Sequence, residues 1–185
     1  MYREAQALGK ELERIGEETL GAVTEAEVAV YFDWDNWWAI ECSAGPSCEL
    51  KYKDEVYLYY EALHSLNIPA DIVGEEDDLE RYKVLIAPIL YMTKPGYDEK
   101  IRRFVEKGGV FVTTFFSGIV DEHDLVITGG YPGRLRDILG IWVEESDALP
   151  HGVQNEFSYQ GIVYPAKLLC DLSHPEGAEA VSYTH

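Results

Sequence analysis

The sequence has 185 residues, of which 46% are hydrophobic and 12% aromatic, so it is long enough for one well-packed domain and too apolar for a disordered chain. Its net charge of −19 excludes nucleic acids and anionic membrane surfaces as partners, because both would be repelled. The charged N-terminus lacks the apolar region of a signal peptide, and no window approaches the ~18 apolar residues of a membrane span. We therefore expect a cytoplasmic protein whose cysteines, Cys42, Cys48 and Cys170, are free thiols.

The N-terminal segment predicts a helix over residues 2–19. Ala5, Leu8, Leu12 and Ile15 recur at spacings of 3, 4 and 3, which places them in one narrow apolar stripe on an otherwise charged helix. A stripe of this kind normally faces a packing partner. We therefore expect this helix to dock on another part of a protein.

Residues 27–143 predict an alternation of strands and helices. Apolar runs predict strands at 28–32, 70–73, 84–87, 110–114 and 141–143, and periodic apolar positions predict helices at 51–66, 95–107 and 134–139. Continuous apolar runs are typical of strands buried on both faces. The pattern therefore predicts a doubly wound, flavodoxin-like α/β fold, in which helices cover both faces of a parallel sheet in a three-layer α/β/α sandwich.

After Pro150 the sequence predicts strands without intervening helices. The runs at 157–159 and 162–164 are rich in β-branched and aromatic residues, which are enriched in strands, and the run at 167–170 is largely apolar. We expect these runs to form hairpin-like or edge strands at the C-terminal end of the fold.

A functional site is expected at the carboxyl ends of the strands, where open parallel sheets bind their ligands. The segments at that edge are 33–38, 88–93 and 114–118. The first is predicted as a loop and is half aromatic, which is costly to leave in water and typical of interfaces. We therefore select six candidate residues that form an interface or enclose a site: Asp33, Trp34, Asp35, Asn36, Trp37 and Trp38.

Ser117 follows a predicted strand, as the nucleophilic serine of α/β hydrolases does. The sharp turn of a nucleophile elbow requires small residues at both glycine positions of G-x-S-x-G, but positions 115 and 119 are Phe and Ile. His123 is close in sequence, yet this turn signature is missing, so we predict that Ser117 is a turn serine. The sequence also contains neither common glycine-rich phosphate loop, and we expect no cofactor.

Asp33 and Asp35 are similar to the D-x-D-x-[TV] opening of the haloacid-dehalogenase phosphatases, in which one Asp is the nucleophile and the next is the acid/base. Position 37 is Trp, which departs from that motif, and the two Asp can equally cap or orient the predicted loop. A free-standing phosphatase-like hydrolase is therefore one alternative function. A sugar-binding module that uses Trp34, Trp37 and Trp38 is another.

Metal binding is not predicted. Cys42 and Cys48 are separated by five residues, which exceeds the usual spacing of zinc-binding cysteine pairs. The five histidines show no H-x-x-x-H or H-E-x-x-H pattern, and His123 lies between two acidic residues in a predicted loop. We expect each histidine to be solvated or locally hydrogen-bonded.

The most specific motif is the F-D-W-D-N-W-W-A run at 32–39, followed by Gly-Pro-Ser at 45–47. Further characteristic segments are 50–52, 59–63, 67–73, 82–88, 108–114, 121–122, 133–141, 169–172 and 174–178. Over nearly its whole length, the sequence therefore resembles the β-galactosidase trimerisation domain of glycoside hydrolase family 42.

This resemblance implies a fold similar to that of class I glutamine amidotransferases, without their catalytic cysteine. It implies a non-catalytic role, which is to hold a homotrimer and to help enclose a neighbouring active site. The parent enzymes hydrolyse terminal non-reducing β-D-galactose residues with glutamates of a TIM barrel that precedes this domain. No residue of this chain would then be catalytic, and a galactoside would be met only through the parent enzyme.

The resemblance also implies a domain organisation. Residues 1–20 would be a helical linker that arrives from the TIM barrel, and residues 21–185 would be the trimerisation domain. Members of the family continue into further strands, so we expect the end at 180–185 to be a truncation.

Overall fold

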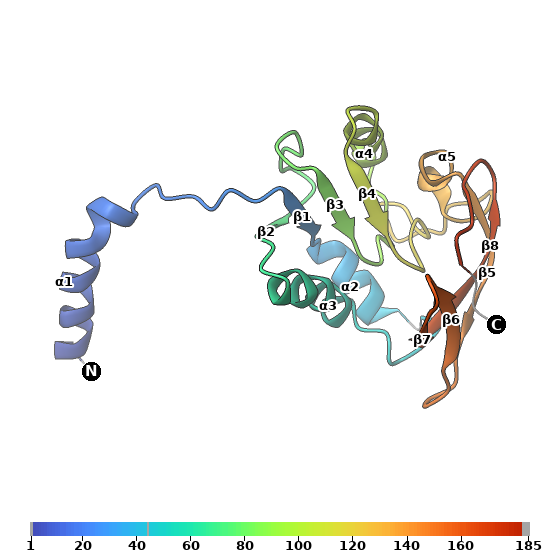
Figure 1. Ribbon diagram of the computed structural model, residues 1–185, viewed down its shortest axis with the longest axis horizontal. Coiled ribbons are helices and arrows are strands. Elements are labelled where there is room, and N and C mark those ends of the chain that lie inside the picture. The colour runs from blue at the N-terminus through green and yellow to red at the C-terminus, as the bar shows by residue number, and fades with distance from the viewer. Residues whose placement is uncertain (1, 44, 183–185) are drawn as a thin grey trace.

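Four short parallel strands form the centre of the protein (Figure 1). The computed structural model describes residues 2–43 and 45–182. Outside the described residues lie Met1 of the predicted linker, Ala44 of the predicted loop and residues 183–185 of the predicted C-terminal end. The strands lie in the order β2-β1-β3-β4, with the limits β1 (Val28–Tyr31), β2 (Ala70–Val73), β3 (Val84–Ala87) and β4 (Val110–Thr113). All three pairings are parallel, which confirms the parallel sheet predicted from the apolar runs.

Helices cover both faces of this sheet. Successive side chains of a strand point to opposite faces. Tyr31 accordingly packs in one core with α4 (Tyr97–Glu106), whereas Val30 packs in a second core with α2 (Trp34–Cys42) and α3 (Tyr52–Ser65). Figure 1 shows α4 on one side of the strands and the other two helices on the opposite side. The predicted three-layer sandwich is confirmed.

Helix α1 (Tyr2–Thr19) stands away from the body and is joined to it by extended chain (Figure 1). Its limits agree with the predicted helix. Leu8 and Leu12 of the predicted apolar stripe are 61% and 57% exposed, so the stripe faces solvent in this structure. Among the described residues, no helix is both long and apolar enough to cross a bilayer.

The strand predicted at 141–143 does not join the parallel sheet. It begins β5 (Ile141–Ala148), which pairs antiparallel with β8 (Leu169–Pro175) in a separate two-stranded sheet. It is preceded by a single turn η1 (Gly133–Leu135) and the short helix α5 (Arg136–Leu139). Only the first residues of β5 are apolar, and its second half is acidic and partly exposed, which suits a half-solvated antiparallel strand rather than a buried parallel one.

The C-terminal hairpin predicted from the β-prone runs is confirmed. Strands β6 (Asn155–Tyr159) and β7 (Ile162–Ala166) pair antiparallel, with Tyr159 opposite Ile162. Gln160 and Gly161 connect them with φ angles of 51° and 79°, as a two-residue type I′ hairpin turn requires. The third run is divided: 167–168 is a connection, and Leu169 begins β8.

Gly109 is required for packing between α4 and β4. A Cβ at this position would lie 2.4 Å from the Phe104 ring, and that ring is buried in the core. We expect Gly109→Ala to lower the free energy of unfolding by about 1–3 kcal/mol, as overpacking of a core does, measured by urea denaturation. At Gly74 the nearest atom to a new Cβ is 3.8 Å away, so Gly74→Ala should leave stability unchanged; equal stability of the two variants would refute the packing argument.

Candidate functional site

The aromatic run after β1 is the first part of helix α2, not the loop that the sequence predicted. Asp33 is the N-cap, and its carboxylate accepts hydrogen bonds from the backbone N–H groups of Asp35 (3.4 Å) and Asn36 (3.2 Å). This satisfies amide groups that have no partner inside the helix. The local signal was present in the sequence, because an Asp before the segment and an acidic residue in its first turn are typical of a helix start.

Asn36 anchors this helix to the centre of the fold. Its side chain is fully buried. Its amide nitrogen donates to the Ile89 carbonyl (2.9 Å), and its amide oxygen accepts from the Met92 N–H (2.8 Å). Both partners belong to the connection that follows β3, so α2 is fixed in position and in rotation against the carboxyl edge of the sheet.

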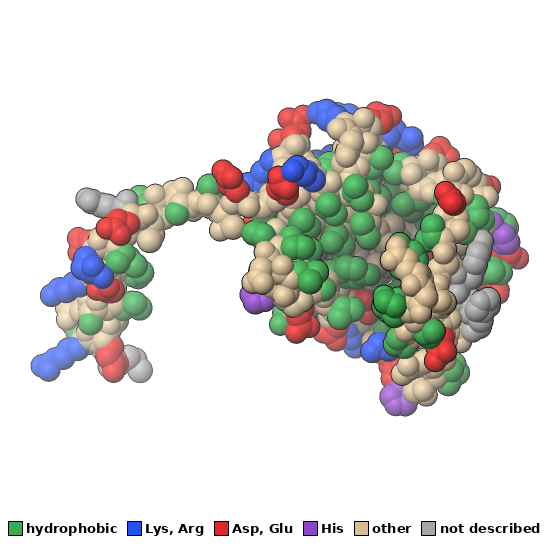
Figure 2. Space-filling model, in the orientation of Figure 1, with side chains coloured by type: hydrophobic (Ala, Val, Ile, Leu, Met, Phe, Trp, Pro, Cys, Tyr) green, Lys and Arg blue, Asp and Glu red, His purple; other side chains and the backbone are tan. Residues whose placement is uncertain are grey.

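The rotation of α2 places two indole rings at the surface. Because Asn36 and Ile40 face inward, Trp34 and Trp38, four residues apart on one helix face, point outward and are 56% and 54% exposed. Trp37 is half-buried, and the Trp34 ring lies 5.2 Å from its ring and 6.0 Å from that of Trp38. Figure 2 shows hydrophobic side chains gathered on the face formed by α2 and the neighbouring strands. We call Trp34, Trp37 and Trp38 the aromatic ridge.

Several contacts hold the ridge rigid on its inner side. Phe32 at the end of β1 packs edge-on against Trp34 (5.3 Å) and beside Tyr52 (5.6 Å). The Lys53 ammonium lies 4.3 Å from the centre of the Trp37 ring, which is cation–π contact. The ridge is therefore preorganised, and little side-chain entropy remains to be lost when it binds a partner.

A cluster of charges flanks the ridge and is centred on Lys94. Its ammonium lies 3.0 Å from Asp33, 2.8 Å from Asp35 and 3.4 Å from Glu75. Burial opposes the charge of Lys94, but hydrogen bonds to Asp35 and Asp33 outweigh this effect and raise the pKa of the ammonium above its usual value. Sequence reasoning missed Lys94 and Glu75, because they reach this place only through the parallel order of the strands.

This charge cluster explains what the two aspartates do. One oxygen of Asp33 accepts from the Lys94 ammonium and from a helix N–H, and the other accepts from a second helix N–H. Asp35 likewise pairs with Lys94. Both carboxylates are therefore committed to capping and charge pairing, as in the capping interpretation, and the arrangement does not favour the phosphatase-like alternative.

Ser117 has a structural role, as predicted from its surroundings in the sequence. It is buried, and its hydroxyl accepts from the Leu90 N–H (3.0 Å), donates to the Thr114 carbonyl (2.9 Å) and lies 2.8 Å from the Thr113 hydroxyl. These bonds join the end of β4 to the connection after β3, to which Asn36 is also bonded, so Ser117 stabilises the same edge of the sheet.

The cysteines and several histidines also behave as predicted. The three cysteines are free thiols. His174 lies 2.7 Å from Glu144, and His151 contacts Glu49, so both are locally bonded at the surface. The ligand atoms of Asp121, Glu122 and His123 lie within 4.8 Å of one another on an exposed turn, although the Asp121 carboxylate accepts two backbone N–H groups there.

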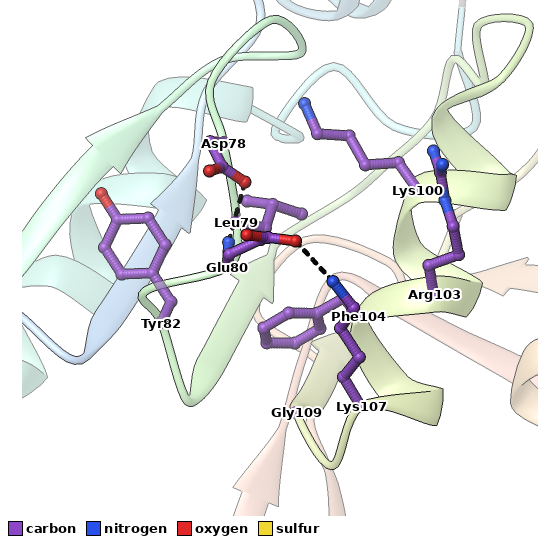
Figure 3. Close-up of a pocket in the computed structure, with 9 residues that line it drawn as sticks. All are labelled: Asp78, Leu79, Glu80, Tyr82, Lys100, Arg103, Phe104, Lys107 and Gly109. Atoms are coloured by element: carbon purple, nitrogen blue, oxygen red, sulfur yellow. Dashed lines mark hydrogen bonds and ion pairs between the residues drawn. The ribbon is translucent and has the colours of Figure 1, made fainter.

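A hollow of about 400 Å³ lies at the other end of the sheet, beside the amino ends of β3 and β4. Figure 3 shows its two walls: Lys100 and Arg103 on α4 with Lys107 directly after it, and Asp78 to Tyr82 on the chain that leads into β3. Lys107 pairs with Glu80 (2.5 Å), and Lys100 donates to the Glu75 carbonyl (2.5 Å). These charges are satisfied by neighbours within the fold, and the hollow shares no residue with the ridge.

Comparison with known proteins gives a consistent result. A sequence model of the family described as the β-galactosidase trimerisation domain matches residues 26–185. The chain is 51% identical over 188 residues to β-galactosidase BgaP of Planococcus sp. (strain L4), and 44% identical over 182 residues to β-galactosidase LacZ of Lactobacillus acidophilus. It is also similar to the crystal structure of β-galactosidase from Bacillus circulans sp. alkalophilus, with 52% identity and a TM-score of 0.90.

These matches cover almost all of this chain but only a minor part of the related proteins. The alignments with BgaP and LacZ include 98% of this chain, and the alignment with the B. circulans structure includes 99% of it. It spans 28% of BgaP, 27% of LacZ and 28% of the crystallised chain. The similarity therefore concerns one section of each larger protein.

We expect the loss of Asn36 to destabilise the whole fold. Asn36→Ala leaves the Ile89 carbonyl and the Met92 N–H buried without their partner, and each such group costs about 1–3 kcal/mol. The free energy of unfolding should fall by about 2–4 kcal/mol in chemical denaturation. Glu41→Ala, at an exposed position of the same helix, is the control. If Asn36→Ala lowers the free energy of unfolding no more than Glu41→Ala does, Asn36 is not an anchor.

Alkaline pH should unfold the protein through its buried phenols. Burial raises the pKa of Tyr31, Tyr52 and Tyr97, and raises that of Tyr91 to about 12. Because these values exceed the ordinary 10.0, the stability due to the neutral phenols is complete below pH 10 and is lost as the pH rises towards 12. Circular dichroism and tyrosinate absorbance should therefore change together in this range.

Tyr97→Phe provides the control for this pH dependence. The Tyr97 hydroxyl is buried and has no hydrogen-bond partner among the described residues, so Phe removes a titrating group without breaking a bond. The alkaline midpoint should rise in this variant. An unchanged or lower midpoint would mean that phenol ionisation does not limit stability at high pH.

Proposed function

Since the chain belongs to the β-galactosidase trimerisation-domain family, we propose that it associates with further copies of itself to form a homotrimer. The observation that carries this proposal is the aromatic ridge, in which two indole rings are more than half exposed although their helix is fixed to the core. Exposed Trp side chains on a rigid base are typical of the energetic centre of an interface. The candidate residues Asp33 to Trp38 form this surface and its support.

The charge distribution supports association through this surface. Copies that each carry a net charge of −19 repel one another, so contact is least costly where charges are already paired. At the ridge, Asp33 and Asp35 are paired with Lys94, and Lys53 lies over an indole ring. The ridge thus combines apolar area with carboxylates that are held in charge pairs.

The domain organisation follows from the same proposal. Residues 1–20 form a linker whose helix α1 packs its stripe on a TIM-barrel domain of the parent protein, and residues 21–185 form the association domain. The exposed Leu8 and Leu12 support this division, because an amphipathic helix is stabilised by packing of its apolar face. The parent protein would be a cytoplasmic β-galactosidase.

In this proposal the chain contributes no catalytic residue, metal ligand or cofactor site. The parent enzyme hydrolyses terminal non-reducing β-D-galactose residues, and the chain contributes to galactoside binding only by helping to enclose the active site of a neighbouring copy. Its own polar groups at the carboxyl edge, Asp33, Asn36 and Ser117, are occupied by internal hydrogen bonds, which supports a structural role.

A charge on the ridge should prevent association. Trp38→Glu replaces a half-exposed indole by a carboxylate that must lose its water in an interface, at a cost of several kcal/mol. We expect sedimentation velocity to show particles of one chain, 20.9 kDa, at concentrations where the unmodified chain forms trimers.

Val110→Glu is the matched control, because Val110 is also about half exposed but lies at the start of β4, away from the ridge. This variant should sediment like the unmodified chain. If Trp38→Glu retains the mass of the unmodified chain, the ridge is not the association surface.

A further inference from the structure

A closed ring of three copies requires two different surfaces on each chain, because the patch that one copy presents meets a different patch on the next. The aromatic ridge can supply only one of them. This inference rests on the proposed self-association and concerns the second surface. The hairpin β6–β7 is the strongest candidate among the described residues.

One face of this hairpin is apolar. Side chains alternate between its two faces, so the paired residues Phe157 and Tyr164 share a face with the paired residues Tyr159 and Ile162. The Phe157 and Tyr164 rings stack at 5.4 Å. Tyr159 and Ile162 are 43% and 55% exposed, so this face presents aromatic and aliphatic side chains to solvent. We call it the ribbon face.

The hairpin is also nearly free of charge. Residues 152–166 contain one charged residue, Glu156, in a chain of which 26% is charged. For chains that repel one another through a charge of −19, this is a segment where a second copy is least opposed. Charge depletion with aromatic enrichment is also the composition of interface cores.

Among the described residues, the hairpin pairs with no third strand. It forms a separate two-stranded sheet that projects from the body in Figure 1, and an isolated two-stranded ribbon is marginally stable in water. At its edge, the Ser182 hydroxyl donates to the Ser158 carbonyl (2.6 Å), which steadies the strand but leaves the ribbon face open. Burial of that face would stabilise the hairpin.

We propose that the ribbon face of one copy packs against the aromatic ridge of the next, and that three such contacts close the ring. The occupant of each ribbon face is therefore a second copy of this chain. Both surfaces are rich in exposed aromatic side chains, and they lie on different elements, α2 and β6–β7, as a heterologous contact requires.

Two adjacent residues of β7 test the ribbon face. Ile162→Glu places a carboxylate on it, whereas Val163→Glu places the same charge on the opposite face at a position of similar exposure, 60% against 55%. In sedimentation velocity, we expect Ile162→Glu to reduce the mass from three chains to one and Val163→Glu to retain three. Trimers of Ile162→Glu would overturn the ribbon proposal and leave the ridge proposal intact.

Mixing two variants tests the pairing itself. Ile162→Glu keeps an intact ridge and Trp38→Glu keeps an intact ribbon face, so the mixture can form one complete contact but cannot close a ring. We expect particles of two chains, twice 20.9 kDa, that neither variant forms alone. A mixture that stays at one chain mass would overturn the pairing of ridge with ribbon. If the unmodified chain itself stays monomeric, both proposals fail.

Discussion

The two hydrogen bonds of Asn36 are the constraint on which the candidate site depends. They join α2 to the connection after β3 at a fully buried position, where an unpaired amide would be costly. Once Asn36 points inward, the helical repeat of 3.6 residues places Trp34 and Trp38 on the outer surface. The exposure of the indole rings is therefore a consequence of how the core is built.

The carboxyl edge of the sheet shows the same principle. In open α/β sheets this edge is the usual place for ligand-binding groups. Here its polar side chains serve the fold: Asp33 caps a helix, Ser117 holds two connections together, and Lys94 pairs with the neighbouring carboxylates. What remains for an external partner is the aromatic ridge, which supports association more than chemistry.

The sequence predicts the layers of this fold well, because their signals are local. The runs that form β1, β3 and β4 are continuously apolar, and the Gln160-Gly161 turn marks the hairpin. The aromatic content of the ridge residues identifies them as a candidate surface, but it does not predict their helix, since three indoles within five residues hide the apolar period that identifies a helix. The N-cap Asp33 was the available signal.

Other features could not be predicted because their determinants are distant in the sequence. Lys94 lies 61 residues from Asp33, and only the strand order β2-β1-β3-β4 brings them together. The strand predicted at 141–143 was placed in the wrong sheet for a similar reason: a short apolar run shows that a strand exists but does not identify its partner. Its partner β8 follows the whole β6–β7 hairpin.

The central claim is that this chain carries complete surfaces for its own association, and the mass of the unmodified chain tests it most directly. Light scattering over a wide range of concentrations should show the mass rise from that of one chain, 20.9 kDa, to a plateau at three times that value. A mass that remains at 20.9 kDa at every concentration would contradict the account.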